Sequence, residues 1–201
     1  MSDPRPYATL LAKGFDRRQR ILAVAQRLLT RNGWRNTSLV QIARGAGIST
    51  AGLQHHFESK EQLLHAVLDA RDLDDEEHAD FDVDIPERIE RVADRFRQAP
   101  DRVGMFVILL IENLEPDAPL RERLLIRYRG SIGLIAEAIR RGQRVGRYRA
   151  DLDARVKAVE IVAFLHGMET SWLFDPSIPL TDVFREYSRS LATQLAPPGT
   201  P

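Results

Sequence analysis

Residues 37–60 carry the side chains of this sequence that are best suited to contact a polyanion. Short hydroxyl, amide and imidazole side chains alternate there with alanine and glycine, and a lysine closes the segment. Hydroxyl, amide and ammonium groups donate hydrogen bonds to phosphate oxygens and to the edges of DNA bases. The candidate DNA-binding residues are Thr37, Ser38, Gln41, Arg44, Ser49, Thr50, Ala51, Gly52, Gln54, His55 and Lys60.

A helix-turn-helix would position these side chains. Ala43 is a small residue at which two helices can cross closely, and Gly47, four residues later, tolerates the positive φ of a tight turn. Ser49 is suited to cap the second helix, which is predicted to run to about His56 and to place its N-terminal end in the major groove. The inward face is apolar, with Leu39, Ile42, Ala46, Ile48 and Leu53. An ordinary antiparallel pair of helices is the alternative, but it rarely combines so short a first helix with this spacing of small residues.

Direct base contacts from the second helix are predicted to be few. Thr50 can hydrogen-bond a base or place its methyl group against thymine. Ala51 and Gly52 only permit a close approach to the duplex. The remaining base contacts must then come from longer polar side chains, such as those of Gln54 and His55.

Phosphate contacts are predicted at the starts of helices, where backbone N–H groups and the helix dipole favour an anion. Lys60 begins the third helix of the segment, Thr37 and Ser38 begin the first, and Arg44 adds a contact to the DNA backbone. Such contacts fix the position of the protein on the duplex but carry no sequence information. The alternative for Ser38 and Ser59 is pure helix capping, and the two roles are compatible.

No metal, cofactor or catalytic centre is predicted. The chain has no cysteine, and the adjacent His55 and His56 point about 100° apart on a helix, so they cannot easily chelate one ion. A helical enzyme using Glu112, Glu169 and His166 is a less favoured alternative, because no motif in the sequence ties these residues together. A helical adaptor that has lost its operator is another alternative.

Residues 15–68 resemble the DNA-binding domain of the tetracycline-repressor (TetR) family. The matching residues are Gly33, Thr37, Ile42, Ala43, Ala46, Gly47, Ile48, Ser49, Leu53, His56, Phe57, Ser59, Lys60, Glu61, Leu63 and Leu64. The resemblance implies a homodimer that binds a palindromic operator, most often as a repressor. It also implies a small-molecule pocket in the C-terminal domain, whose occupancy changes the spacing of the two DNA-binding heads. This chain has Gln54 where many members have a phosphate-contacting tyrosine.

Charge is divided unevenly along a chain whose formal net charge is zero. Residues 1–60 contain 10 Lys/Arg against 3 Asp/Glu, whereas residues 61–201 contain 19 against 26. A basic N-terminal module on an acidic body indicates that the first part meets a polyanion. The sequence shows no secretory signal, and its most apolar run, at 103–114, is too short to span a bilayer. We therefore expect a cytoplasmic protein with no membrane partner.

Apolar residues recur with helical periodicity, which predicts an all-α fold of about nine helices. The predicted helices are 16–32, 38–45, 49–56, 59–73, 86–98, 101–114, 119–146, 153–173 and 180–195. The predicted divisions are a flexible arm at 1–14, a three-helix DNA-binding domain at 15–68, a ligand-binding and dimerisation domain at 69–195 and a disordered tail at 196–201. Nine acidic residues within 69–84 are interpreted as a frayed helix end and a solvated linker.

The second domain is predicted to bind a small, largely apolar effector and to form the dimer. The nearly all-apolar helix at 101–114 must be surrounded by other helices, and a pocket among them would contain few polar groups. The candidate pocket residues are Phe96, Met105, Phe106, Leu109, Asn113, Tyr128, His166 and Trp172. The candidate dimer residues are Val159, Ala163, Gly167, Thr170, Phe184, Tyr187 and Leu191. Plain core packing is the alternative for each of these side chains.

Overall fold

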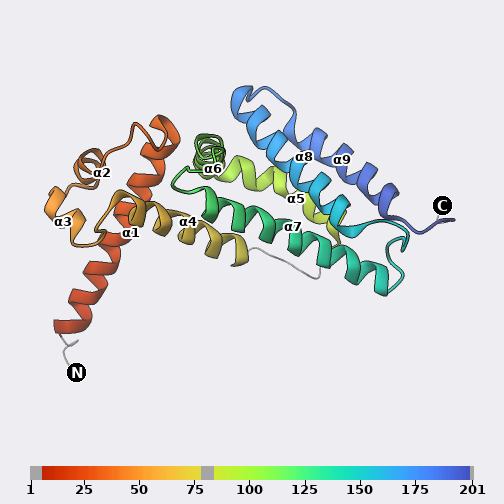
Figure 1. The fold of residues 1–201 in the computed structure, drawn as a ribbon, viewed down its shortest axis with the longest axis horizontal. Coiled ribbons are helices and arrows are strands. Elements are labelled where there is room, and N and C mark those ends of the chain that lie inside the picture. Colours follow the sequence, from red (N-terminus) through yellow and green to blue (C-terminus); the bar gives the residue numbers. More distant parts are fainter. Residues whose placement is uncertain (1–5, 78–83, 200–201) are drawn as a thin grey trace. The chain divides into compact units, whose positions relative to one another are not determined.

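The computed structural model describes the backbone of residues 6–77 and 84–199 and the side chains of residues 15–70 and 84–199. Within these ranges every regular element is an α-helix, which confirms the predicted fold class (Figure 1). The helices are α1 (Pro6–Asn32), α2 (Leu39–Ala46), α3 (Thr50–Gln54), α4 (Lys60–Glu77), α5 (Ile85–Gln98), α6 (Pro100–Glu112), α7 (Arg121–Arg144), α8 (Ala154–Phe174) and α9 (Leu180–Leu195).

The chain divides into two compact units, residues 1–78 and 79–201. The first unit contains α1 to α4 and the second contains α5 to α9. Whereas the sequence analysis ended the first domain at residue 68, the first unit extends further because α4 continues through the acidic run to Glu77. Residues 78–83, which belong to the predicted acidic linker, lie outside the described residues.

Helix α1 begins at Pro6, ten residues before the start at Asp16 that the sequence analysis predicted. Proline fits the first helical turn, where its missing N–H has no partner to lose, and the alanines and leucines that follow are strong helix formers. Residues 6–14 of the predicted arm are therefore helical, and Asp16 lies inside the helix. Residues 1–5 lie outside the described residues.

The first unit is held together by α1, which packs against both α2 and α4, while α2 also packs against α3. The side chains at its centre are aliphatic or aromatic and fully buried. They include Ile21, Ala25, Ile42, Leu53, Phe57, Leu63 and Leu64. Because every helix of the unit contributes to this core, the short helices α2 and α3 are fixed by tertiary packing that their own length could not provide.

In the second unit α5 packs against α9, and α7 and α6 each pack against α8. Phe184 of α9 lies at the centre of the aromatic packing, with its ring 5.5 Å from that of Phe96 in α5 and 5.3 Å from that of Phe164 in α8. Both ring pairs have the edge-to-face geometry that aromatic side chains favour. The apolar core thus joins three helices that are far apart in the sequence.

Tyr148 fastens the turn after α7 to the start of α5. Its ring lies against Gly142, where an added Cβ would come within 2.2 Å of the ring. Its hydroxyl accepts a hydrogen bond from the Ile85 N–H at 3.1 Å and donates one to the carboxylate of Asp84. Burial, reinforced by the Asp84 carboxylate, raises the pKa of Tyr148 above its ordinary value, so this hydroxyl stays protonated and keeps donating.

The C-terminal residues after α9 are not helical in the described range, which ends at residue 199. The helix stops at Leu195, and Gly199 adopts a positive φ of 84°. Residues 200 and 201 of the predicted tail lie outside the described residues. Among the described helices, none combines the length and the apolar character that crossing a membrane requires.

Candidate nucleic-acid interface

Helix α2 begins with a complete capping box. The Ser38 hydroxyl accepts a hydrogen bond from the Gln41 N–H at 3.2 Å, and the Gln41 side-chain oxygen accepts one from the Ser38 N–H at 2.7 Å. This reciprocal pair satisfies backbone donors that the first turn of a helix leaves without partners. Both side chains remain exposed, so the N-terminus of α2 can still meet an anion.

The turn between α2 and α3 depends on Gly47, as the sequence predicted. Its φ of 68° lies in the left-handed region that glycine adopts without strain. The Ile48 N–H donates to the Ala43 carbonyl at 3.0 Å, and the Gly47 N–H donates to the Arg44 carbonyl at 3.2 Å. Together these bonds form a Schellman motif, which ends α2 and turns the chain directly into the next helix.

Gly45 sets how closely α1 and α2 approach, and the sequence analysis overlooked it. A Cβ at this position would lie 2.7 Å from Cγ1 of Val24 in α1, closer than real contacts allow. Ala43, which was predicted to be the small residue at the crossing, is buried. The signal was present in the sequence, because Gly45 stands inside a helix where glycine is otherwise unfavourable.

Helix α3 is short, and it is fixed by a cap at its start and by one buried side chain. The Ser49 hydroxyl accepts a hydrogen bond from the Gly52 N–H at 3.0 Å, and Leu53 is completely buried. The helix ends at Gln54, two residues before the predicted end. The exposed side chains on and beside it are those of Ser49, Ala51, Gln54 and His55, whereas Thr50 and Gly52 are half-buried.

His55 and His56 lie edge to face with ring centroids 5.8 Å apart. Burial lowers the pKa of His56, and the positive charges of His55, Arg17 and Arg18 lower it further. No group of side chains suited to a metal ion is found among the described residues. The positive surroundings of His56 indicate that this part of the unit favours an anionic partner.

Thr37 is not placed to bind phosphate, contrary to the prediction. The residue is 1% exposed, and its hydroxyl donates to the Gly33 carbonyl at 2.7 Å, near the end of α1. Its N–H donates to the Trp34 carbonyl at 3.3 Å. Thr37 therefore closes the α1–α2 loop, and both of its donors are already used inside the protein.

Lys60 also has an internal role that sequence reasoning missed. Its ammonium donates a hydrogen bond to the Trp34 carbonyl and lies 4.0 Å from the centre of the Trp34 ring, in a cation–π contact. Lys60 is half-buried and Trp34 is 9% exposed. An ammonium has three donors, so a phosphate contact is compatible with this geometry. Within the protein, the Lys60 side chain links the start of α4 to Trp34, just after α1.

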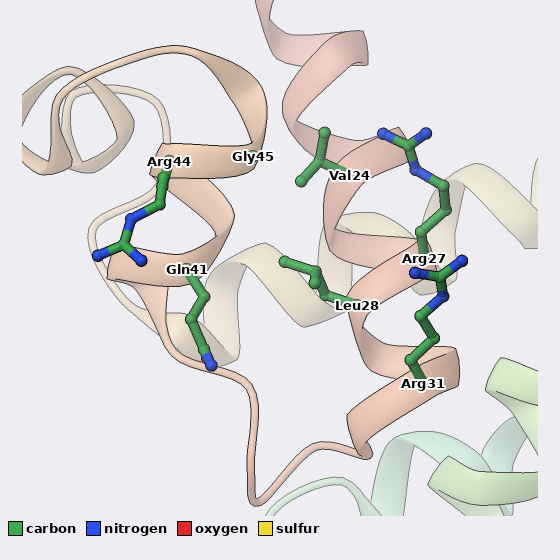
Figure 2. A pocket seen from close by; sticks show the side chains of 7 residues that line it. All are labelled: Val24, Arg27, Leu28, Arg31, Gln41, Arg44 and Gly45. Carbon is green, nitrogen blue, oxygen red and sulfur yellow. The ribbon is translucent and has the colours of Figure 1, made fainter.

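A groove lies between α1 and α2 (Figure 2). We call it the α1–α2 groove; its volume is about 410 Å³, and it is lined by Val24, Arg27, Leu28, Arg31, Gln41, Arg44 and Gly45. Arg27 and Arg31 stand on the α1 side and Arg44 on the α2 side, with Val24 and Leu28 between them. Of these residues only Gln41 and Arg44 were predicted to contact DNA.

The structure brings some of the predicted effector-pocket residues together. The rings of Phe106 in α6 and Tyr128 in α7 lie 5.4 and 5.6 Å from His166 in α8. Phe96 and Trp172 form a separate contact, with centroids 6.5 Å apart. The completely buried members of the predicted set are Met105 and Leu109, which are 1% and 0% exposed.

Asn113, one of the predicted pocket residues, has a structural role in the loop after α6. Its amide nitrogen donates to the Leu109 carbonyl at 2.7 Å, and its side-chain oxygen accepts from the Leu120 N–H at 3.1 Å. The side chain is 3% exposed. It closes the loop between α6 and α7, because it pairs backbone groups at both ends of that loop.

The predicted dimer residues fall into two groups. Those on α8 are exposed and occupy one face of the helix: Val159, Ala163, Gly167 and Thr170. Phe184 and Leu191 on α9 are instead 0% exposed and belong to the core of the second unit, so their assignment to an intersubunit surface is wrong. Apolar periodicity identifies a buried face but not the helix that covers it.

Tyr187 of α9 is half-buried, whereas the α8 residues are exposed and the other two α9 residues are fully buried. Its ring stacks on that of Phe164 in α8 with centroids 3.6 Å apart, and burial, reinforced by the Glu160 carboxylate, raises the pKa of Tyr187 to about 12. Its hydroxyl is buried and has no hydrogen-bond partner among the described residues. A buried hydroxyl without a partner is unfavourable.

Two family models match separate parts of the chain. Residues 21–67 match the N-terminal model of the bacterial regulatory proteins of the TetR family, and residues 110–196 match the C-terminal model of the BetI-type transcriptional repressors. The chain belongs to the TetR family. The resemblance identified from residues 15–68 is thereby confirmed, and the C-terminal match extends it to the second unit.

Curated relatives agree with this assignment. A 66-residue segment, 33% of this chain, is 39% identical to the regulator EthR of Mycolicibacterium smegmatis and spans 30% of its length. The regulator TtgR of Pseudomonas putida is 26% identical over a match of 174 positions including gaps, which covers 79% of this chain and 81% of TtgR.

Solved structures show the same fold. A TetR regulator from Chloroflexus aurantiacus superposes with a TM-score of 0.76 at 24% identity, over 92% of this chain and 98% of the other. A transcriptional regulator from Saccharomonospora viridis, solved in complex with choline, gives 0.70 at 27% identity, over 88% and 95%. FadR of Bacillus subtilis, solved with stearoyl-CoA, gives 0.73 at 17% identity, over 88% and 98%.

Proposed function

We propose that this chain is a cytoplasmic transcriptional regulator that binds a palindromic DNA operator as a homodimer and represses transcription until an effector binds. The observation that carries the proposal is the α2–turn–α3 corner. Caps at Ser38 and Ser49 and the left-handed Gly47 hold it in one geometry, and it leaves polar side chains such as Gln54 exposed. The excess of basic residues in 1–60 supplies the attraction to DNA.

A dimer is part of the proposal because one copy of α3 offers few base contacts. Two-fold symmetry doubles the contacts and matches a palindromic site. The exposed face of α8 is suited to pack against its own copy, because Ala163 and Gly167 are small and an added Cβ at Gly167 would meet nothing within 4 Å. Val156 and Val159 on the same helix are 66% and 40% exposed, which leaves apolar area for a partner to cover.

The effector is proposed to bind in the second unit beside Phe106, Tyr128 and His166. These three rings come from three helices, so a ligand among them would shift the packing of all three. The ligands named for FadR and for the Saccharomonospora regulator support a ligand-responsive function for this chain. We propose a small, largely apolar molecule, because aromatic side chains surround His166.

Selection of bound fragments from random duplex DNA tests the proposal directly. The full chain is expected to enrich a palindrome and to bind it far more tightly than unrelated duplex at physiological salt. Thr50→Ala and Gln54→Ala should change which bases are preferred. Arg129→Gln, which removes an exposed arginine from α7, is the control and should bind like the wild type. If no sequence is enriched, the adaptor interpretation replaces this one.

The effector is tested with the selected operator. Choline, a long-chain acyl-CoA and a long-chain fatty acid are the first probes, measured by thermal shift and by release of labelled duplex. An effector should raise the melting temperature and weaken DNA binding together, because it stabilises one of two conformers. A molecule that stabilises the protein but leaves operator affinity unchanged would contradict the proposed coupling.

A further inference from the structure

The three arginines of the α1–α2 groove have no acidic partner among the described residues. Arg27, Arg31 and Arg44 are all exposed, and within the described residues none of them pairs with a carboxylate. In the second unit exposed arginines commonly do pair, as Arg91 does with Glu87 and Arg185 with Asp182. The groove is therefore a concentration of positive charge that the chain itself does not neutralise.

The form of this groove fits a polyanion better than a single small anion. A small anion is held firmly where its donors are buried, because the low dielectric strengthens each contact. Here all three guanidinium groups stand in solvent at the sides of the groove, where one contact contributes little. A polyanion gains from many such contacts, because each one releases condensed counterions.

We propose that the α1–α2 groove binds the sugar–phosphate backbone of the operator duplex, with Arg27 and Arg31 supplying phosphate contacts from α1. This inference rests on the proposed DNA-binding function and extends it to α1, which lies outside the helix-turn-helix. Its effect is on affinity and on the position of the protein, since phosphate contacts do not distinguish sequences.

The placement of the groove supports this role. Gln41 lines it and also belongs to the capping box at the N-terminus of α2, so the groove begins where the proposed function already places DNA. Arg27 and Arg31 are four residues apart on α1, which separates them by about 6 Å along the helix and directs both to one side. The aliphatic surface of Val24 and Leu28 between the arginines can accept the apolar face of deoxyribose.

The test compares the wild type with Arg27→Gln/Arg31→Gln on the selected operator and on an unrelated duplex. Affinity is measured by fluorescence anisotropy at several salt concentrations. Each lost phosphate contact should lower the slope of log affinity against log salt by about 0.9, which corresponds to about an eightfold loss of affinity at 0.1 M salt. The loss should be equal on both duplexes, because the contacts read no bases.

Matched variants separate a contact from a general charge effect. Arg129→Gln/Arg141→Gln removes the same charge from exposed positions of α7 and should leave the salt slope unchanged. Arg27→Lys/Arg31→Lys keeps the charge and should retain most of the slope. Equal losses in the two Gln pairs, or a wild-type slope in Arg27→Gln/Arg31→Gln, would overturn the inference.

A titration with inorganic phosphate and pyrophosphate, in the absence of DNA, decides between duplex and free anion. We expect no saturable binding below millimolar concentrations. Tight binding that disappears in Arg27→Gln/Arg31→Gln would overturn the inference in favour of a small-anion site. Failure of the proposed function has a different signature, because the wild type would then bind no duplex with measurable salt dependence, and this inference would fail with it.

Discussion

Replacing Gly45 by alanine tests the close packing of α1 on α2. Alanine favours a helix over glycine by up to about 1 kcal/mol. At this position, however, its Cβ would lie 2.7 Å from Cγ1 of Val24, which is buried and branched at Cβ and has few rotamers to move into. Overpacking of this kind costs about 1–3 kcal/mol. We expect Gly45→Ala to destabilise the first unit by up to about 2 kcal/mol, the difference between these two effects.

A double-mutant cycle identifies the cause. Val24→Ala removes the methyl group that meets the new Cβ and costs about 2 kcal/mol through lost burial and a small cavity. In the double variant the clash is absent, so the two changes together should cost about 1–3 kcal/mol less than their sum. A side-chain clash produces such coupling, whereas independent effects would add.

Tryptophan fluorescence reports each unit separately in the full chain. Trp34 lies in the first unit and Trp172 in the second, so urea unfolding is followed through Trp34 in a Trp172→Phe background. Gly133→Ala is the control, followed through Trp172 in a Trp34→Phe background. Gly133 is exposed in α7 with nothing within 4 Å of an added Cβ, so alanine should stabilise the second unit. The packing argument is refuted if Gly45→Ala also stabilises, or if the cycle is additive.

Three further predictions concern the rest of the chain. Tyr148→Phe should destabilise the second unit by about 1–3 kcal/mol in urea unfolding, because the buried Ile85 N–H loses its acceptor; an unchanged midpoint would contradict this. Light scattering should show that Gly167→Arg is a folded monomer, whereas the wild type is a dimer. Gly133→Arg, at an equally open position, should remain a dimer. A dimeric Gly167→Arg would show that α8 is not part of the interface. Because the pKa of His56 is lowered in the folded state, the unfolded chain binds a proton first as the pH falls through about 6.5. The stability of the first unit should therefore decrease from pH 7 to pH 5, and His56→Gln should flatten this dependence if the assignment is correct.

The features that the sequence predicted well are those decided within a few residues. The capping box at Ser38, the cap at Ser49 and the left-handed turn at Gly47 each involve groups no more than five positions apart. The residue types needed for such local geometry are few, so their spacing is informative. The same reasoning predicted the bounds of the later helices closely, because prolines and glycines stand near their ends.

The features that were missed depend on contacts between distant segments. The link from Lys60 to Trp34 spans 26 positions, and no local pattern separates it from the expected phosphate contact. Phe184 and Leu191 were assigned to the dimer because an apolar face does not identify which helix will cover it. Arg27 and Arg31 look like ordinary solvated residues of an amphipathic helix until α2 is placed beside them.

The central claim is that the α2–turn–α3 corner meets the duplex, and backbone amide chemical shifts test it most directly. The isotopically labelled full chain is titrated with its selected operator and, separately, with an unrelated duplex of equal length. The account predicts that operator-specific shifts concentrate in residues 49–55, with smaller shifts common to both duplexes at Ser38, Gln41 and Arg44. Operator-specific shifts confined to the second unit, with residues 38–60 unchanged, would contradict it.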